Sequence, residues 1–140
     1  MKKILLGLFS LSLLATACKK SKDAPAPTKE NLAGKYKMTA MIEKSPGMQD
    51  VDLYATHTDA CDKDNITELK TDGTYTYSDV GVVCEPADDG QGTWSVSGNT
   101  ITFDEYPVTI SKFDGSTLEI TDTYVVDSVT YTDITTYKKQ

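Results

Sequence analysis

The chain has 140 residues, of which 39% are hydrophobic, and it carries a formal net charge of −7 with no arginine among its 14 basic residues. Basic side chains neutralise the phosphates of nucleic acids, and arginine forks capture phosphates and carboxylates. The composition therefore argues against nucleic-acid binding and favours neutral or cationic ligands over anionic ones.

The first seventeen residues have the layout of a secretory signal peptide. Two lysines precede an apolar run over residues 4–14, and the small residues 15–17 follow it. This order is typical of export signals, and the run is too short for the roughly 30 Å hydrocarbon core of a bilayer. We expect residues 1–17 to be removed, which leaves 12 lysines against 21 acidic residues and a charge near −9.

Cys18 follows this segment directly. The sequence Leu14-Ala15-Thr16-Ala17-Cys18 resembles the bacterial lipobox, in which cleavage before the cysteine exposes it for lipidation. The resemblance implies an anchor of two or three acyl chains, enough for stable attachment to a membrane. The alternative is ordinary cleavage after the A-x-A sequence of residues 15–17, which releases a soluble protein with a free thiol.

Residues 18–30 are predicted to be a flexible tether. Lysine, serine and alanine surround Pro25 and Pro27 there, without apolar periodicity. The remaining residues, 31–140, suffice for one domain.

Short runs of Thr, Tyr, Val and Ile fill this domain, separated by Gly, Asp and Asn. The runs predict strands at residues 36–42, 66–70, 74–78, 92–97, 100–105, 108–112, 117–126 and 129–138. Turn pairs such as Asp72-Gly73 and Gly98-Asn99 make the connections hairpins. We therefore predict an all-β fold, an eight-stranded antiparallel up-and-down barrel, whose closure leaves no sheet edge.

Alternation assigns faces to some of these strands. Tyr36, Met38, Ala40 and Ile42 are expected to share one face of the first strand. Ile66 and Leu69 fall on opposite faces, which indicates a bulged or shortened strand. In the last strand the faces are ambiguous, because the face of Tyr131 and Tyr137 includes Asp133, whereas Ile134 lies on the other.

The three cysteines form an odd set. With Cys18 assigned to the lipid, Cys61 and Cys84 remain as a pair in an oxidising compartment, where a disulfide between them is expected. With only one histidine, His57, the chain lacks the donors of a zinc site.

Several motifs together resemble the lipocalin-like lipoproteins common in Bacteroidetes. They are Leu32-Ala33-Gly34-Lys35-Tyr36, Cys61-Asp62-Lys63-Asp64-Asn65, Thr71-Asp72-Gly73-Thr74-Tyr75, Cys84 and Gly92-Thr93-Trp94. The resemblance implies a small barrel anchored by lipid in the cell envelope. Gly34-Lys35-Tyr36 replaces the lipocalin Gly-x-Trp, and the arginine that stacks on that tryptophan has no counterpart. Because lysines follow Cys18 where surface-exported relatives carry acidic residues, the resemblance favours the periplasmic face of the outer membrane.

Two groups of residues suggest chemistry. His57 lies in an irregular segment without a nucleophile motif, so no catalytic residue is assigned. Asp59, Asp62, Asp64 and Asn65 offer oxygen atoms to a cation but lack EF-hand spacing. We interpret them as turn and capping residues, leaving a cation site as the alternative.

The aromatic residues supply the candidate ligand site. We predict that Tyr75, Tyr77 and Trp94 line the mouth of a barrel that binds a small neutral or apolar ligand, without a cofactor and without enzymatic activity. The alternative is a structural or interaction module, in which the aromatic side chains fill the core and the surface contacts another envelope protein.

Overall fold

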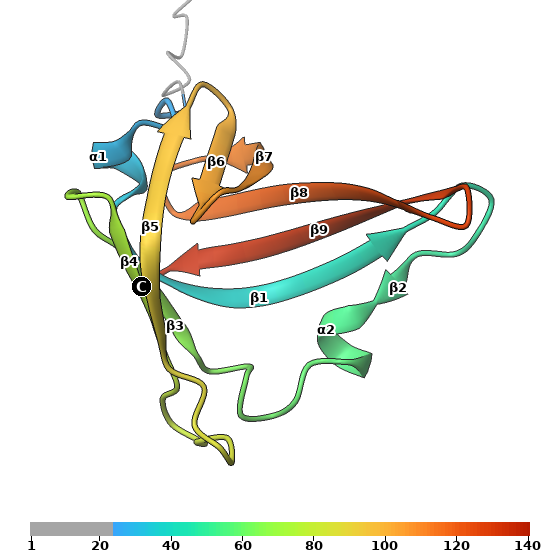
Figure 1. The fold of residues 1–140 in the computed structure, drawn as a ribbon, viewed down its shortest axis with the longest axis horizontal. Helices are drawn as coiled ribbons and strands as arrows, with labels where there is room; N and C mark the ends of the chain where they lie inside the picture. The colour runs from blue at the N-terminus through green and yellow to red at the C-terminus, as the bar shows by residue number, and fades with distance from the viewer. Residues whose placement is uncertain (1–23) are drawn as a thin grey trace, which may run out of the picture.

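The computed structural model describes residues 24–140, so the predicted signal peptide, Cys18 and the first part of the tether lie outside the described residues. Eight strands form a closed antiparallel barrel in which each strand pairs with its neighbour in the chain and the last pairs with the first (Figure 1). They are β1 (Gly34–Lys44), β3 (Ile66–Leu69), β4 (Thr74–Ser78), β5 (Gly90–Ser97), β6 (Thr100–Phe103), β7 (Tyr106–Phe113), β8 (Thr117–Val126) and β9 (Val129–Lys139). The predicted all-β up-and-down barrel is confirmed.

Three short elements were not predicted from the sequence. They are α1 (Lys29–Leu32), α2 (Leu53–Thr56) and β2 (Val51–Asp52), which pairs with the end of β1. The Thr28 hydroxyl accepts a hydrogen bond from the Asn31 amide at 3.3 Å and so caps α1. Lys29 and Glu30, which the sequence placed in the tether, therefore form the first turn of a helix.

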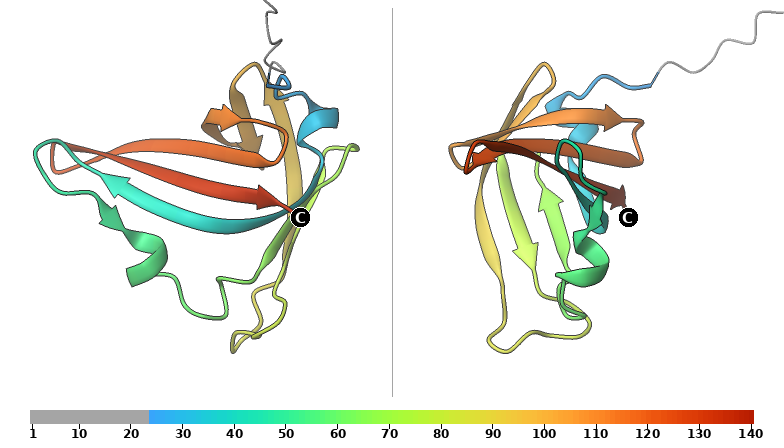
Figure 2. Two further views of the ribbon diagram at one scale, coloured as in Figure 1. Left: turned by 180° about the vertical axis from the view of Figure 1, so that it is seen from behind. Right: turned by 90° about the vertical axis from the view of Figure 1, so that its right-hand side faces the viewer.

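The two ends of the barrel differ. We call the end that holds α1 and the hairpin turns β3–β4, β5–β6 and β7–β8 the closed end. At the opposite, open end, β1, β8 and β9 run side by side well beyond the other strands, and β2 and α2 follow from β1 there (Figures 1 and 2). Among residues 24–140, the structure contains no helix with the length and apolar character to cross a bilayer.

The register corrects the predicted faces of the first strand and settles the alternatives left open for two others. A bulge between Met38 and Ala40 shifts β1, so that Met41 and Glu43 follow Tyr36 and Met38 on the inner face, whereas Ala40 and Ile42 do not. In β3 no register shift occurs, and the strand is simply shorter than predicted. In β9 the inner face contains Tyr137 and, by alternation, Thr135, Asp133 and Tyr131.

The hydrophobic core lies at the closed end of the barrel. Its buried members are Leu32, Tyr36, Leu69, Trp94, Ile101, Val108, Ile110, Phe113 and Leu118. The two polar aromatic groups in this set have partners: the Tyr36 hydroxyl donates to the Leu32 carbonyl at 2.7 Å, and Trp94 Nε1 donates to the Lys70 carbonyl at 2.9 Å. Buried tyrosine and tryptophan usually need such partners, and here they fix α1 and the β3–β4 turn against the barrel.

The predicted disulfide between Cys61 and Cys84 is present. It joins the segment before β3 to the long β4–β5 loop at the open end. Asp79 stabilises the same loop, because its Oδ2 accepts hydrogen bonds from the amides of Cys84 at 2.9 Å and Asp88 at 3.1 Å. Asp64 Oδ2 likewise accepts from the Val82 amide at 3.0 Å.

Candidate ligand cavity

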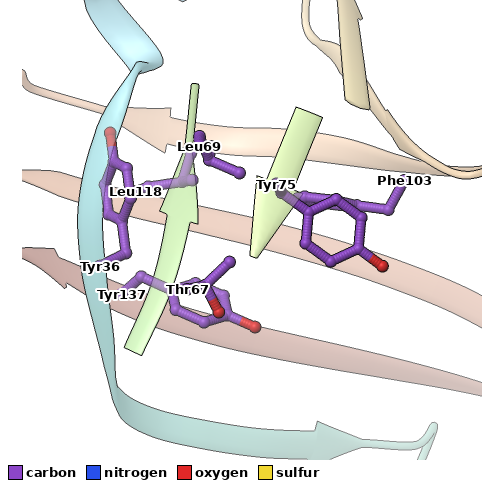
Figure 3. Close-up of a pocket in the computed structure, with 7 residues that line it drawn as sticks. All are labelled: Tyr36, Thr67, Leu69, Tyr75, Phe103, Leu118 and Tyr137. Carbon is purple, nitrogen blue, oxygen red and sulfur yellow. The ribbon is translucent and has the colours of Figure 1, made fainter. Parts of the chain in front are cut away.

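A partly open cavity of about 170 Å³ lies inside the barrel next to the core. The strands β1, β3, β4, β6, β8 and β9 supply its wall. The side chains that line it are those of Tyr36, Thr67, Leu69, Tyr75, Phe103, Leu118 and Tyr137 (Figure 3). An apolar cavity of about 150 Å³ stays dry and takes up benzene in a well-studied engineered protein. The cavity in this barrel is therefore large enough for one small ring system and too small for an extended chain, since drug-sized pockets run from about 300 Å³ upward.

One wall of the cavity is a fixed aromatic pair. The rings of Tyr75 and Phe103 meet edge to face, with centroids 5.5 Å apart and planes at 89°. The Tyr75 hydroxyl donates to Asp104 Oδ2 at 2.9 Å, and Asp104 Oδ1 accepts from the Thr93 amide at 2.7 Å. These hydrogen bonds lower the pKa of Asp104, the Thr93 amide contributing most, and the bond to Asp104 raises the pKa of Tyr75. The Tyr75 ring is thus held in place before any ligand arrives.

Gly92 allows this arrangement. It lies opposite Tyr75 in the β4–β5 ladder. A Cβ atom at Gly92 would lie 2.6 Å from Tyr75 Cε1 and 2.4 Å from Asp104 Oδ2, closer than real contacts permit. The absence of a side chain therefore lets the tyrosine ring and the Asp104 carboxylate approach β5.

The four hydroxyl groups of the cavity wall differ in their partners, and that of Tyr75 bonds Asp104. The Tyr36 hydroxyl points to the closed end, where it bonds Leu32, and burial raises its pKa to about 12. The hydroxyls of Thr67 and Tyr137 point the other way (Figure 3). Within residues 24–140, neither of these two forms a side-chain hydrogen bond, and burial raises the pKa of Tyr137 to about 12. Tyr137 therefore remains protonated at neutral pH and offers a free O–H group to the cavity.

Three carboxylates form a row on the inner face, nearer the open end. The register places Glu43 of β1 directly opposite Asp133 of β9, and Asp133 directly opposite Asp122 of β8. Asp133 and Tyr137 are four positions apart along β9, so both point inward. Glu43 Oε2 accepts from the Tyr124 hydroxyl at 2.9 Å, and Asp122 accepts from the Tyr106 hydroxyl. We refer to Glu43, Asp133 and Asp122 as the carboxylate row.

Asp133 is the least favourably placed carboxylate of this row. Its Oδ1 atom is buried and has no hydrogen-bond partner among the described residues. Desolvation raises its pKa, and the negative charges of Glu43 and Asp122 raise it further. Like charges directly opposite one another on a sheet also destabilise the pairing.

Replacing Asp133 with Asn should therefore stabilise the protein at neutral pH, by up to about 1 kcal/mol. Because the pKa of Asp133 is raised in the folded state, the wild-type penalty is absent below the ordinary aspartate pKa of about 3.9, develops as the pH rises to the raised folded value, and is constant above it. Urea unfolding of Asp133→Asn and wild type at pH 3 and pH 7 measures the difference. Equal gains at both pH values would contradict this explanation, and Asp127→Asn, in the exposed β8–β9 turn, is the control.

The three aromatic residues predicted to line one mouth lie in different places. Tyr75 lines the cavity. Tyr77 lies on the same face of β4, and its hydroxyl accepts a hydrogen bond from Asn65 Nδ2 at 2.8 Å near the open end. Trp94 is only 3% exposed and belongs to the core at the closed end. The cavity instead includes Thr67 and Tyr137, which no motif of the sequence indicated.

The other candidate residues stabilise loops. Asp64 and Asn65 accept hydrogen bonds from amides of the β4–β5 loop, which agrees with the interpretation as turn and capping residues. Cys61, Asp62 and Cys84 lie close together, but the two sulfur atoms are bonded to each other. His57 is exposed at the end of α2 and contacts the Thr56 hydroxyl at 2.8 Å.

Comparison with known proteins agrees with this architecture. The model of the lipocalin-like domain family matches residues 32–136, most of the described chain. The chain belongs to the lipocalin-like domain family. A solved structure of the siderocalin Ex-FABP, described as functioning through dual ligand specificities, is similar with a TM-score of 0.49 and 17% sequence identity, covering 79% of this chain and 74% of that chain. No curated protein shows significant similarity to the chain.

Membership of the family has a general consequence for function. Lipocalin-like barrels are binding proteins rather than enzymes as a rule, and many of them take small hydrophobic ligands. In this member the cavity lies inside the barrel, next to the core.

Proposed function

We propose that this protein binds one small apolar molecule in the barrel cavity and has no enzymatic activity. The observation that carries the proposal is the cavity itself, about 170 Å³ of space walled by Leu69, Leu118 and the aromatic rings. Empty apolar space inside a core costs contact energy, and natural proteins keep few such voids. A ligand that fills the space recovers those contacts.

The cavity wall is also largely formed before a ligand binds. The hydrogen bond to Asp104 already holds the Tyr75 ring, and the Phe103 ring packs against it edge to face, so little side-chain freedom is lost on binding. Small-molecule sites are typically apolar, with a few placed polar groups, and largely formed in advance. The cavity has this character on a small scale.

Filling the cavity should abolish ligand binding. Toluene is expected to raise the melting temperature of the wild-type protein and to leave that of Leu118→Trp unchanged, because the indole occupies the space. Val126→Trp, a comparable enlargement in the exposed part of β8, should still respond to toluene. A melting temperature that toluene leaves unchanged in the wild type would refute ligand binding. If Leu118→Trp does not fold, Thr67→Leu fills the cavity from the opposite wall.

We propose further that the barrel is anchored by a lipid on Cys18 at the periplasmic face of the outer membrane. The lipobox-like sequence supports the anchor, and the lysines after Cys18 support the face. The chain enters the barrel at the closed end, next to α1, so an anchored barrel would direct its open end away from the membrane (Figure 2). Cys18→Ser should move the protein from the membrane to the soluble fraction, and unchanged membrane retention would refute the anchor.

The alternative, an interaction module, has one observation in its favour. Three valines near the β8–β9 turn, Val125, Val126 and Val129, are 66%, 49% and 37% exposed. Exposed apolar side chains grouped in this way are frequent at protein contacts. Pull-down from envelope extracts with wild type and with Val125→Ser/Val126→Ser would distinguish this function, because the double variant leaves the cavity unchanged.

A further inference from the structure

The cavity can be assigned a chemical class of ligand from its size, its wall and its charges. Building on the proposed function, we propose that it takes a small neutral aromatic molecule with one hydrogen-bonding group, of the size of a phenol or an indole. The polar atom of that molecule is bound by the Tyr137 hydroxyl, with Thr67 beside it.

Size gives the first limit. A cavity of about 170 Å³ slightly exceeds the space that holds benzene and lies well below the usual range for larger ligands. One ring, or two fused rings, can be enclosed there. A long acyl chain cannot.

The shape and chemistry of the wall favour an aromatic ring. Tyr36, Tyr75, Phe103 and Tyr137 present rings from four different strands (Figure 3). Aromatic pairs in edge-to-face or offset arrangements gain energy beyond that of burial alone. The edge-to-face pair of Tyr75 and Phe103 already forms one side of such a packing arrangement, at a centroid distance of 5.5 Å.

The hydroxyls of the wall favour a single polar group on the ligand. Of the three tyrosine hydroxyls that line the cavity, that of Tyr36 bonds Leu32 and that of Tyr75 bonds Asp104. The Tyr137 hydroxyl forms no hydrogen bond within residues 24–140 and points, like that of Thr67, away from the closed end (Figure 3). A hydroxyl of the wall that is not already paired can bond a polar atom of the ligand, which favours such a ligand over a purely apolar one.

Charge excludes ionised ligands from the cavity. None of the seven wall residues carries a charge at neutral pH. An anion would be desolvated there without a basic partner, and it would also approach the carboxylate row of Glu43, Asp133 and Asp122 on the same inner face. A cation would find its counter-charges in that row rather than in the cavity. The ligand within the cavity is therefore neutral.

Calorimetry with matched probes tests this assignment. Phenol should bind the wild-type protein about fivefold more tightly than toluene, because one net hydrogen bond is worth about that factor. Tyr137→Phe should remove the preference by weakening phenol binding and leaving toluene binding unchanged. Tyr131→Phe, the same substitution at an inner-face position that does not line the cavity, should keep the preference. Benzoate, the anionic analogue, should not bind.

The outcomes separate this inference from the function on which it rests. If toluene binds and phenol shows no preference, or if Tyr137→Phe keeps the preference, the assigned ligand class is wrong while apolar binding stands. If neither toluene nor phenol binds the wild type, the proposed function fails as well. Binding of benzoate as tight as that of phenol would overturn the role given to charge.

Discussion

Leu32→Ala is expected to lower the free energy of unfolding by about 3 kcal/mol, within the range for buried leucines. Leu32 is 0% exposed although it lies in a helix of only four residues that precedes the barrel. Its side chain belongs to the core at the closed end, and its carbonyl accepts the Tyr36 hydroxyl. Such a short helix is not stable by itself, so packing must hold it.

Urea denaturation of wild type and Leu32→Ala measures this loss. Leu53→Ala provides the matched control, because Leu53 occupies the other four-residue helix and is only half-buried. Its loss should be clearly smaller. Equal losses in the two variants would show that α1 is not a specific cap of the barrel.

Removing the disulfide should cost a similar amount. The bond between Cys61 and Cys84 spans 23 residues, and the chain-entropy estimate for a loop of this length is about 3 kcal/mol. The loop that it restrains includes β3 and β4, which supply Thr67, Leu69 and Tyr75 to the cavity. We therefore expect Cys61→Ala/Cys84→Ala to lose stability and part of its affinity for the cavity ligand.

Reduction of the wild-type protein is the control for this double variant. Dithiothreitol should lower the urea midpoint of the wild type to that of Cys61→Ala/Cys84→Ala and should not change the midpoint of the variant. A wild-type midpoint that does not respond to reduction would contradict the stabilising role of the bond.

Much of the barrel could be predicted because turn chemistry and strand composition agree locally. Pairs such as Asp72-Gly73 and Gly98-Asn99 mark hairpins, and Gly73 and Gly98 indeed have positive φ angles of 91° and 57°. The pairing of Cys61 with Cys84 could be predicted because the number of cysteines is odd and the compartment predicted for an exported chain is oxidising. The turn pairs act within a few residues, and the cysteine argument uses only a count. Neither therefore depends on how the strands pair across the barrel.

The inner face was harder to predict because it depends on register. The bulge in β1 between Met38 and Ala40 has no distinct residue signature, yet it moves every later side chain to the other face. In β9 the polar Asp133 lies on the same face as Tyr137, which obscured the alternation. Tyr137 could therefore not be assigned to the cavity before the strands were paired.

Trp94 illustrates a different limit. A tryptophan on an inner face is compatible with either a core or a ligand site, and its strand alone does not say which. The hydrogen bond from Nε1 to the Lys70 carbonyl and the proximity of α1 place it in the core. Both features arise from segments distant in sequence.

Methyl NMR with toluene tests the central claim most directly, that a ligand enters the cavity between the core and the carboxylate row. On titration with toluene, the methyl resonances of Leu69 and Leu118 should shift, because both side chains line the cavity. Those of Val82 and Val83, which are 60% and 55% exposed in the β4–β5 loop, should not. Shifts confined to the exposed valines, or no shift at Leu69 and Leu118 at saturating toluene, would contradict a ligand-binding cavity in this barrel.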